Sequence, residues 1–204
     1  MVHIFLDEKT FHGCNGLDIT DEIRVTVATQ ACIMALHTPH QVYPGLRTIA
    51  MYPRAYRARN SGDGSAPQHR AGESWTYGPV VLAWSHVKGG SRNPNDGRNV
   101  VLHEFAHQLD QADGSGDGAP SLETRSHYRE WSATLGASYD ELVALTNKGK
   151  RSFIDAYGAT NPAEFFAVAT ETFFEKADKM RRDEPELYDV LKKYYKLDPA
   201  EWDA

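Results

Sequence analysis

The sequence predicts an α+β fold with a small sheet, and three observations support this class. The strand candidates fall in the first half of the chain, before residue 90. Helical patterns fill most of the second half. The length of 204 residues suffices for one domain with a substantial core and is short for two full-sized ones. We therefore expect a single domain over residues 1–204, with strands early and helices late.

In the first half, short apolar runs alternate with turn residues. Residues 23–36 combine a β-branched start with a helix-favouring run, and we expect a helix after Thr26. Strands are expected where short apolar runs lie between turn residues, over Leu46–Pro53 and Trp75–Val87. Loops are expected where Gly, Ser, Asn and Asp gather, at 59–74 and 89–97.

The second half reads as a series of helices. The first, VVLHEFAHQLD at residues 100–110, follows the loop at 89–97. Further helices are expected at about Leu122–Leu135, Tyr139–Asn147, Pro162–Lys176 and Pro185–Tyr195.

Composition excludes several classes of protein. No apolar run approaches the ~20 residues of a membrane helix, so we expect no membrane span. A formal charge of −6 and a pI near 5.8 oppose attraction to a phosphate backbone, so direct nucleic-acid binding is disfavoured. The opening residues lack the pattern of a secretory signal, and we expect a cytoplasmic protein. Cys14 and Cys32 make no metal-type spacing and are interpreted as free thiols.

The helix at 100–110 carries two histidines four residues apart with a glutamate between them. At ~100° per residue, His103, Glu104, His107 and Asp110 fall on one side and apolar residues on the other. Imidazoles one turn apart converge on one cation, and Glu104 can reach a water bound to it. This is the HExxH pattern of zincins, in which Zn²⁺ lowers the pKa of the water towards ~7 and the glutamate accepts the proton.

These residues also have explanations that involve no metal. His103 and His107 also fit the solvent-exposed face of an ordinary amphipathic helix. Asp110 could orient a metal ligand from behind, or it could be a solvated acid at the helix end.

A catalytic zinc needs a third protein ligand, and the segment 155–176 offers candidates. Asn161 fits an N-cap, with Glu164, Glu171 and Glu175 in one stripe of the helix that follows. Glu164 also stands at the capping-box position, and the other two glutamates could simply be exposed. Spacing alone does not choose among the three.

Three motifs in order, HEFAHQLD preceded by WTYGPVVLAW and followed by DAYGATNPAEFFAV, resemble the Mlc titration factor A family of zinc-dependent peptidases. The resemblance runs from roughly Ile23 to the end. A tyrosine seven residues before the glutamate of EFFA is similar to lethal-factor-type toxin peptidases. The resemblance implies a zincin-like domain with a gluzincin site and one Zn²⁺ per chain. His103, His107 and Glu164 would hold the metal, Glu104 would be the general base, and Tyr157 would donate to the developing oxyanion.

The resemblance also implies function and partners. It implies aminopeptidase-type cleavage of small peptides and binding to a transcriptional repressor of the Mlc type. Members of the family carry an additional N-terminal helical segment, which we expect to be absent here. Gly78–Trp84 precedes the histidine helix, and we expect it to be the sheet edge that holds substrate, with a buried core strand as the alternative.

Two other functions compete with the peptidase. One is a zinc-containing module that sequesters a repressor without physiologically relevant proteolysis. The other is a structural zinc protein, in which a fourth protein ligand would close the site.

Overall fold

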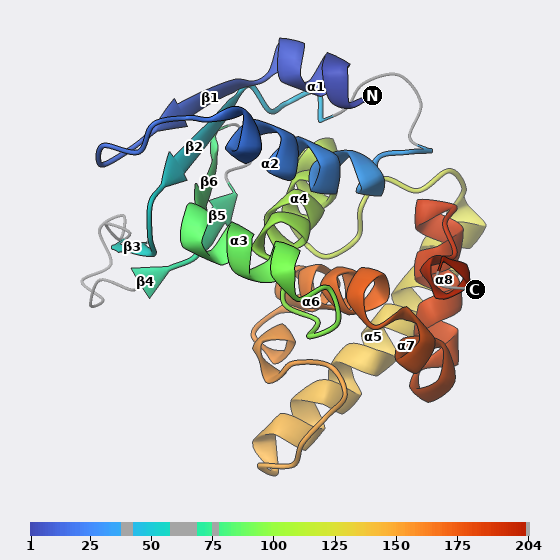
Figure 1. Ribbon diagram of the computed structural model, residues 1–204. Coiled ribbons are helices and arrows are strands. Elements are labelled where there is room, and N and C mark those ends of the chain that lie inside the picture. The colour runs from blue at the N-terminus through green and yellow to red at the C-terminus, as the bar shows by residue number, and fades with distance from the viewer. Residues whose placement is uncertain (38–42, 58–68, 75–77, 203–204) are drawn as a thin grey trace.

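A four-stranded mixed sheet forms in the N-terminal half of the computed structural model, which describes residues 1–37, 43–57, 69–74 and 78–202 (Figure 1). The strand order is β1 (Thr10–Gly13), β2 (Thr48–Tyr52), β6 (Val80–Ala83) and β5 (Gly72–Ser74). The first three strands are parallel, and β5 is antiparallel to β6. A separate antiparallel pair, β3 (Tyr56–Arg57) and β4 (His69–Arg70), precedes β5. The expected α+β class with a small mixed sheet is confirmed.

The expectation that Gly78–Trp84 forms the sheet edge is wrong. Its strand, β6, lies between β2 and β5, and all four of its residues are buried. An apolar run of this length satisfies a buried strand, which was the alternative. Among the described strands, β5 is the edge beside β6. Residues 69–74 were expected to be loop, but they contain two short strands. The β3 backbone pairs with His69–Arg70, and the β6 backbone pairs with Gly72–Ser74, next to the 2.8 Å bond from Ala83 N to Ala71 O. The rest of that expected loop, 59–68, lies outside the described residues.

Helices α1 (Val2–Glu8) and α2 (Asp21–Met34) pack against each other in this half. We expected the second to start after Thr26, at residue 27, but it starts six residues earlier, at Asp21. Thr20 caps it by accepting a hydrogen bond from Ile23 N, and Asp21 and Glu22 occupy its first turn, where acidic groups favour a helix. The cap outweighs the β-branched residues that suggested a strand.

The expected strand at Trp75–Val87 is also shorter than predicted. Residues 75–77 lie outside the described part, and helix α3 (Trp84–Arg92) begins directly after β6. Its last turn includes residues that we expected to be loop. Gln30 of α2 explains this, because its amide donates to Ser91 Oγ at 2.8 Å while Ser91 donates to Val87 O. This tertiary contact stabilises a helix that local sequence does not favour.

The C-terminal half is helical, as expected. It contains α4 (Val100–Asp110), α5 (Arg125–Asn147), α6 (Pro162–Glu175), α7 (Ala177–Asp183) and α8 (Pro185–Tyr195), with short 3₁₀ turns at Gln111–Asp113, Ala156–Ala159 and Pro199–Glu201. The two helices expected over 122–147 are one. Trp131, Leu135 and Leu142 are buried along one continuous stripe of α5, so no break is needed.

Two aromatic clusters anchor α4 and α6 from opposite sides. Phe105 of α4 is fully buried against Phe5 and Tyr43, with ring centroids 5.9 and 4.8 Å away. Phe173 of α6 stacks on Tyr195 of α8 at 5.6 Å. The two helices also pack against each other where the halves of the molecule meet (Figure 1). In the described ranges, no helix combines the length and apolarity needed to cross a membrane.

Candidate metal centre

Helix α4 presents both histidines to the junction with α6. Asn99 starts the helix, because its side-chain oxygen accepts hydrogen bonds from Val101 N and Leu102 N at 3.1 and 3.2 Å. One turn apart, the His103 and His107 rings lie 4.9 Å from each other, and each side chain is 13% exposed. The two imidazoles are therefore fixed by one rigid helix and remain accessible.

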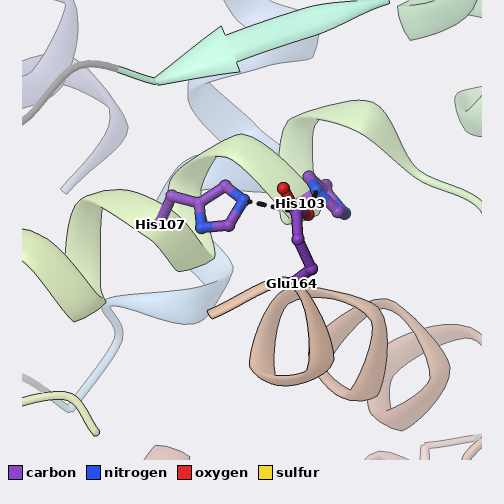
Figure 2. A group of neighbouring side chains, drawn as sticks. All are labelled: His103, His107 and Glu164. Carbon is purple, nitrogen blue, oxygen red and sulfur yellow. Dashed lines mark hydrogen bonds and ion pairs between the residues drawn. The ribbon is translucent and has the colours of Figure 1, made fainter. Parts of the chain in front are cut away.

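Glu164 reaches the same point from the first turn of α6. Asn161 caps that helix through a 2.9 Å bond from Glu164 N, and Pro162 occupies the first turn, where no N–H is needed. The Glu164 Oε2 atom lies 2.9 Å from His103 Nε2 and 3.4 Å from His107 Nε2. Figure 2 shows the three side chains pointing toward one another. The carboxylate is therefore turned to the histidines.

These three donors fit a divalent transition metal ion. Their ligand atoms lie within 4.8 Å of one another. Tetrahedral Zn²⁺ with bonds of ~2.0–2.1 Å would separate its ligand atoms by ~3.3 Å, close to the observed distances. Two imidazoles and one carboxylate form a set that leaves a position open for substrate or water. Across the described residues, the group contains no fourth His, Cys, Asp or Glu.

The histidines and carboxylates of the group shift one another's pKa values. Burial lowers the pKa of His103, but Glu164 and Glu171 outweigh it and raise that pKa to about 10. Burial raises the pKa of Glu164, but its contacts with the two histidines outweigh it and hold that pKa well below its ordinary value. A bound cation would replace the positive charge that protons supply here, so metal binding and proton release are linked.

Glu171, one of the three candidate ligands on α6, contacts the ring nitrogen of His103 that does not face Glu164. Its Oε1 lies 2.7 Å from His103 Nδ1, and its Oε2 accepts a hydrogen bond from Asn99 N. A carboxylate behind a metal-binding imidazole fixes the ring's orientation and tautomer. Glu171 is buried, so the alternative of simple exposure does not hold for it.

Asn99 connects α4 to the third glutamate of the stripe. Its side-chain nitrogen, Nδ2, donates to Glu175 Oε1 at 3.0 Å, and Glu175 Oε2 accepts from Arg98 N at 2.9 Å. Burial raises the pKa of Glu175 to about 7. Sequence reasoning missed this role of Asn99. Its position directly before VVLHEF was the available signal, since Asn is a preferred N-cap.

Glu104 lies deeper than its place in the HExxH helix suggested. Only 5% of the residue is exposed. Burial raises the pKa of its carboxyl to about 7, against the opposing effect of His103 and His107. A carboxylate whose pKa lies near neutrality can both accept and return a proton.

Tyr157, which the family resemblance implied as a donor, lies beside Glu164. Asp155 caps the 3₁₀ turn that carries it, by accepting from Tyr157 N at 3.0 Å, and Arg98 pairs with Asp155 at 2.8 Å. The Tyr157 hydroxyl donates to Glu164 Oε1 at 3.2 Å. The residue is 55% exposed, so its phenol is at the surface of the site rather than in the core.

Asp110 matches neither role considered for it. It is fully buried, and its two carboxylate oxygens accept from Gly118 N at 2.9 and 3.0 Å. Trp131 Nε1 donates to Gly118 O at 2.9 Å. Asp110 and Trp131 thus hold the peptide groups on both sides of Gly118, in the loop after α4. Asp110 therefore supports a loop that lies against Pro162 at the start of α6.

One open cleft of about 760 Å³ is lined by the three candidate ligands and by the groups around them, Glu104, Tyr157 and Glu171. Edge strand β5 forms one wall, α4 the floor and the start of α6 another wall. A cleft of this size, with a few polar groups converging in it, is typical of a site for a small ligand or peptide.

Comparison with known proteins agrees with this geometry. The family model for glucose-regulated metallo-peptidase M90 matches residues 1–196. The slr2042 protein of Synechocystis sp. is 44% identical over 205 residues, which cover 97% of this chain and 74% of the relative.

Two further relatives are called Mlc titration factor A. The protein from Serratia proteamaculans is 29% identical, over 95% of this chain and 76% of the relative. That from Klebsiella pneumoniae subsp. pneumoniae is 30% identical, over 96% and 76%. The resemblance drawn from the three motifs is thereby confirmed. The chain belongs to the family described as glucose-regulated metallo-peptidase M90, a family of metallopeptidases.

Proposed function

We propose that this protein is a zinc-dependent peptidase of the gluzincin type, with one Zn²⁺ held by His103, His107 and Glu164. The observation that carries the proposal is the convergence of these three side chains within 4.8 Å, at the floor of an open cleft. When bound, Zn²⁺ supplies Lewis acidity, which polarises a substrate carbonyl and lowers the pKa of water. Proton transfer and stabilisation of the oxyanion are assigned to side chains of the protein.

Glu104 is the proposed general base. It follows His103 directly on α4, and its carboxyl group has a pKa of about 7 because it is buried. Such a group accepts a proton from the attacking water and then passes it to the leaving amine. Its burial also limits competition from bulk water.

Tyr157 is the proposed donor to the oxyanion. Its hydroxyl contacts Glu164 Oε1 at 3.2 Å and is therefore close to the position where a bound carbonyl would develop charge. A donor of this kind stabilises the transition state more than the bound substrate, because the charge grows during attack.

Peptide substrates are proposed to lie along β5. In an antiparallel pair, alternate residues turn their backbone groups toward the neighbouring strand and away from it. Ala71 O accepts from Ala83 N, so the N–H and C=O of the next residue, Gly72, are directed to the open side. An extended peptide could pair with this edge directly beside Glu104. Aminopeptidase-type cleavage is part of the proposal because the family resemblance implies it.

The proposal is tested by metal analysis together with a peptide-library cleavage assay. The unchanged protein should contain one zinc per chain and cleave peptides. His103→Ala should abolish tight zinc binding and cleavage together. Cleavage by a variant that holds no metal, or undiminished zinc in that variant, would contradict the ligand assignment.

A second candidate function is sequestration of a transcriptional repressor of the Mlc type, in the cytoplasm. The observation that favours it is the name of the relatives, which associates those proteins with titration of Mlc. Binding of a purified Mlc-type repressor to the unchanged protein and to Glu104→Gln separates the two functions. If both proteins bind equally while only the former cleaves peptides, sequestration does not depend on proteolysis. If neither binds, the second candidate is rejected.

A further inference from the structure

Gly72 of the edge strand lies directly against the Glu104 side chain. A Cβ atom added at Gly72 would lie 2.6 Å from Cγ and 2.8 Å from Cδ of Glu104, and nearer still to Oε1. Carbon atoms in favourable contact lie ~3.5–4.0 Å apart. No side chain can therefore occupy this position while Glu104 keeps its place.

Backbone conformation does not explain this glycine. The described glycines with positive φ are 16, 97, 114, 118 and 149, so Gly72 adopts a conformation open to any residue. Gly72 belongs to a regular antiparallel strand, paired with Leu82 of β6. Glycine in a strand weakens it and often marks a close approach by another group. Here the approaching group is the carboxylate of Glu104.

The helix backbone that carries Glu104 has little room to move away from an added side chain at residue 72. The neighbouring residues Phe105 and Ala106 are fully buried, and Glu104 itself is 5% exposed. Helix α4 is also tied to β5 by the 2.7 Å hydrogen bond from Gln108 Nε2 to Ser74 Oγ. Strand and helix are thus held at a fixed separation, and the gap between them suits glycine.

We propose that Gly72 is a positioning residue for Glu104, an inference that rests on the proposed peptidase function. The missing side chain lets the carboxylate lie immediately beneath the strand edge where substrate is proposed to bind. An alanine at 72 would displace the carboxylate sideways while leaving His103, His107 and Glu164 in place. The base would then be misaligned although the metal group is intact.

Kinetics of Gly72→Ala test the inference. The expected result is a fall in kcat of about 10–10²-fold, a smaller change in KM, and a zinc affinity like that of the unchanged protein. Gly89→Ala is the matched control, because a Cβ there meets nothing within 4 Å. An unchanged kcat in Gly72→Ala, or a loss explained by lost zinc, overturns the proposal.

Thermal unfolding tests the same contact without any assay of activity. Gly72→Ala should lower the Tm by about 3–10 °C in the unchanged background and in Glu104→Gln, which keeps the size of the side chain. In Glu104→Ala, which removes the three clashing atoms, the same substitution should have little effect on Tm. An equal loss of Tm in all three backgrounds overturns the proposal. If the unchanged protein proves inactive on peptides, the proposed function fails, and the unfolding series still decides whether Gly72 makes room for Glu104.

Discussion

His103 and Glu171 are joined by a 2.7 Å contact between Nδ1 and Oε1, on the side of the imidazole opposite the metal group. The same carboxylate accepts a hydrogen bond from Asn99 N at the start of α4. Glu171 therefore fixes both the ring and the helix that carries it. Glu164 uses one oxygen for the two histidines and the other for Tyr157, so the two glutamates of α6 have different tasks.

Removing each carboxylate should distinguish these tasks. Glu164→Gln should weaken zinc binding most, because a ligand is lost. Glu171→Gln should weaken it by about 10–100-fold, the usual effect of losing the partner behind a metal-bound histidine. Competition with a chromogenic chelator measures both affinities. A larger loss in Glu171→Gln than in Glu164→Gln would show that the ligand assignment is wrong.

Asn99→Asp should destabilise the fold although Asp is as good an N-cap as Asn. The substitution keeps the capping oxygen but replaces the amide that donates to Glu175 with a second carboxylate. We expect a loss of about 1–3 kcal/mol in the free energy of unfolding, measured with urea. Thr124→Asp, which changes the N-cap of α5, is the control and should stay within about 1 kcal/mol. Equal effects of the two substitutions would argue against the contact with Glu175.

Tyr157→Phe should separate binding from chemistry. Tyr157 is 55% exposed, so removing its hydroxyl should leave Tm and zinc content nearly unchanged. We expect kcat to fall by roughly 10–10³-fold with a smaller change in KM. Steady-state kinetics and thermal unfolding on one preparation measure both effects. A normal kcat in the fully metallated variant would rule out the donor role.

Asp110 should make stability depend on pH. Burial raises its pKa to about 6 from an ordinary 3.8, against hydrogen bonds from Gly118 and Ala119. Between these values the folded state keeps a proton that the unfolded state has lost, so stability falls as pH rises. Relative to Asp110→Asn, the free energy of unfolding should drop by about 2–3 kcal/mol from pH ~4 to pH ~6 and then level off. Urea unfolding across this range measures it, and parallel curves for the two proteins would contradict the shift.

The sequence predicted the two helices of the site well because local signals define both. Asn161 and Pro162 mark the start of α6, and the apolar period of α4 separates its histidines from its core face. The i, i+4 spacing of His103 and His107 requires only helix geometry. The choice of Glu164 over Glu171 needed family resemblance, because both lie on the same stripe.

Relations between distant segments were not predictable from local patterns. Val80–Ala83 would be equally apolar as an edge or an internal strand, so its burial between β2 and β5 depends on the whole sheet. Likewise, Glu171 meets His103 across 68 positions of sequence. Glu104 can lie close to β5 because residue 72 of that strand is glycine, and the apolar pattern of α4 contains no information about that strand.

Glu104 is proposed to transfer a proton next to a metal ion that His103, His107 and Glu164 hold. The most direct test is zinc content and kcat measured together on Glu104→Gln. We predict one zinc per chain, unchanged thermal unfolding and a loss of at least ~10²–10⁴-fold in kcat. Peptide turnover near that of the unchanged protein in the fully metallated variant, or loss of the zinc itself, would contradict it.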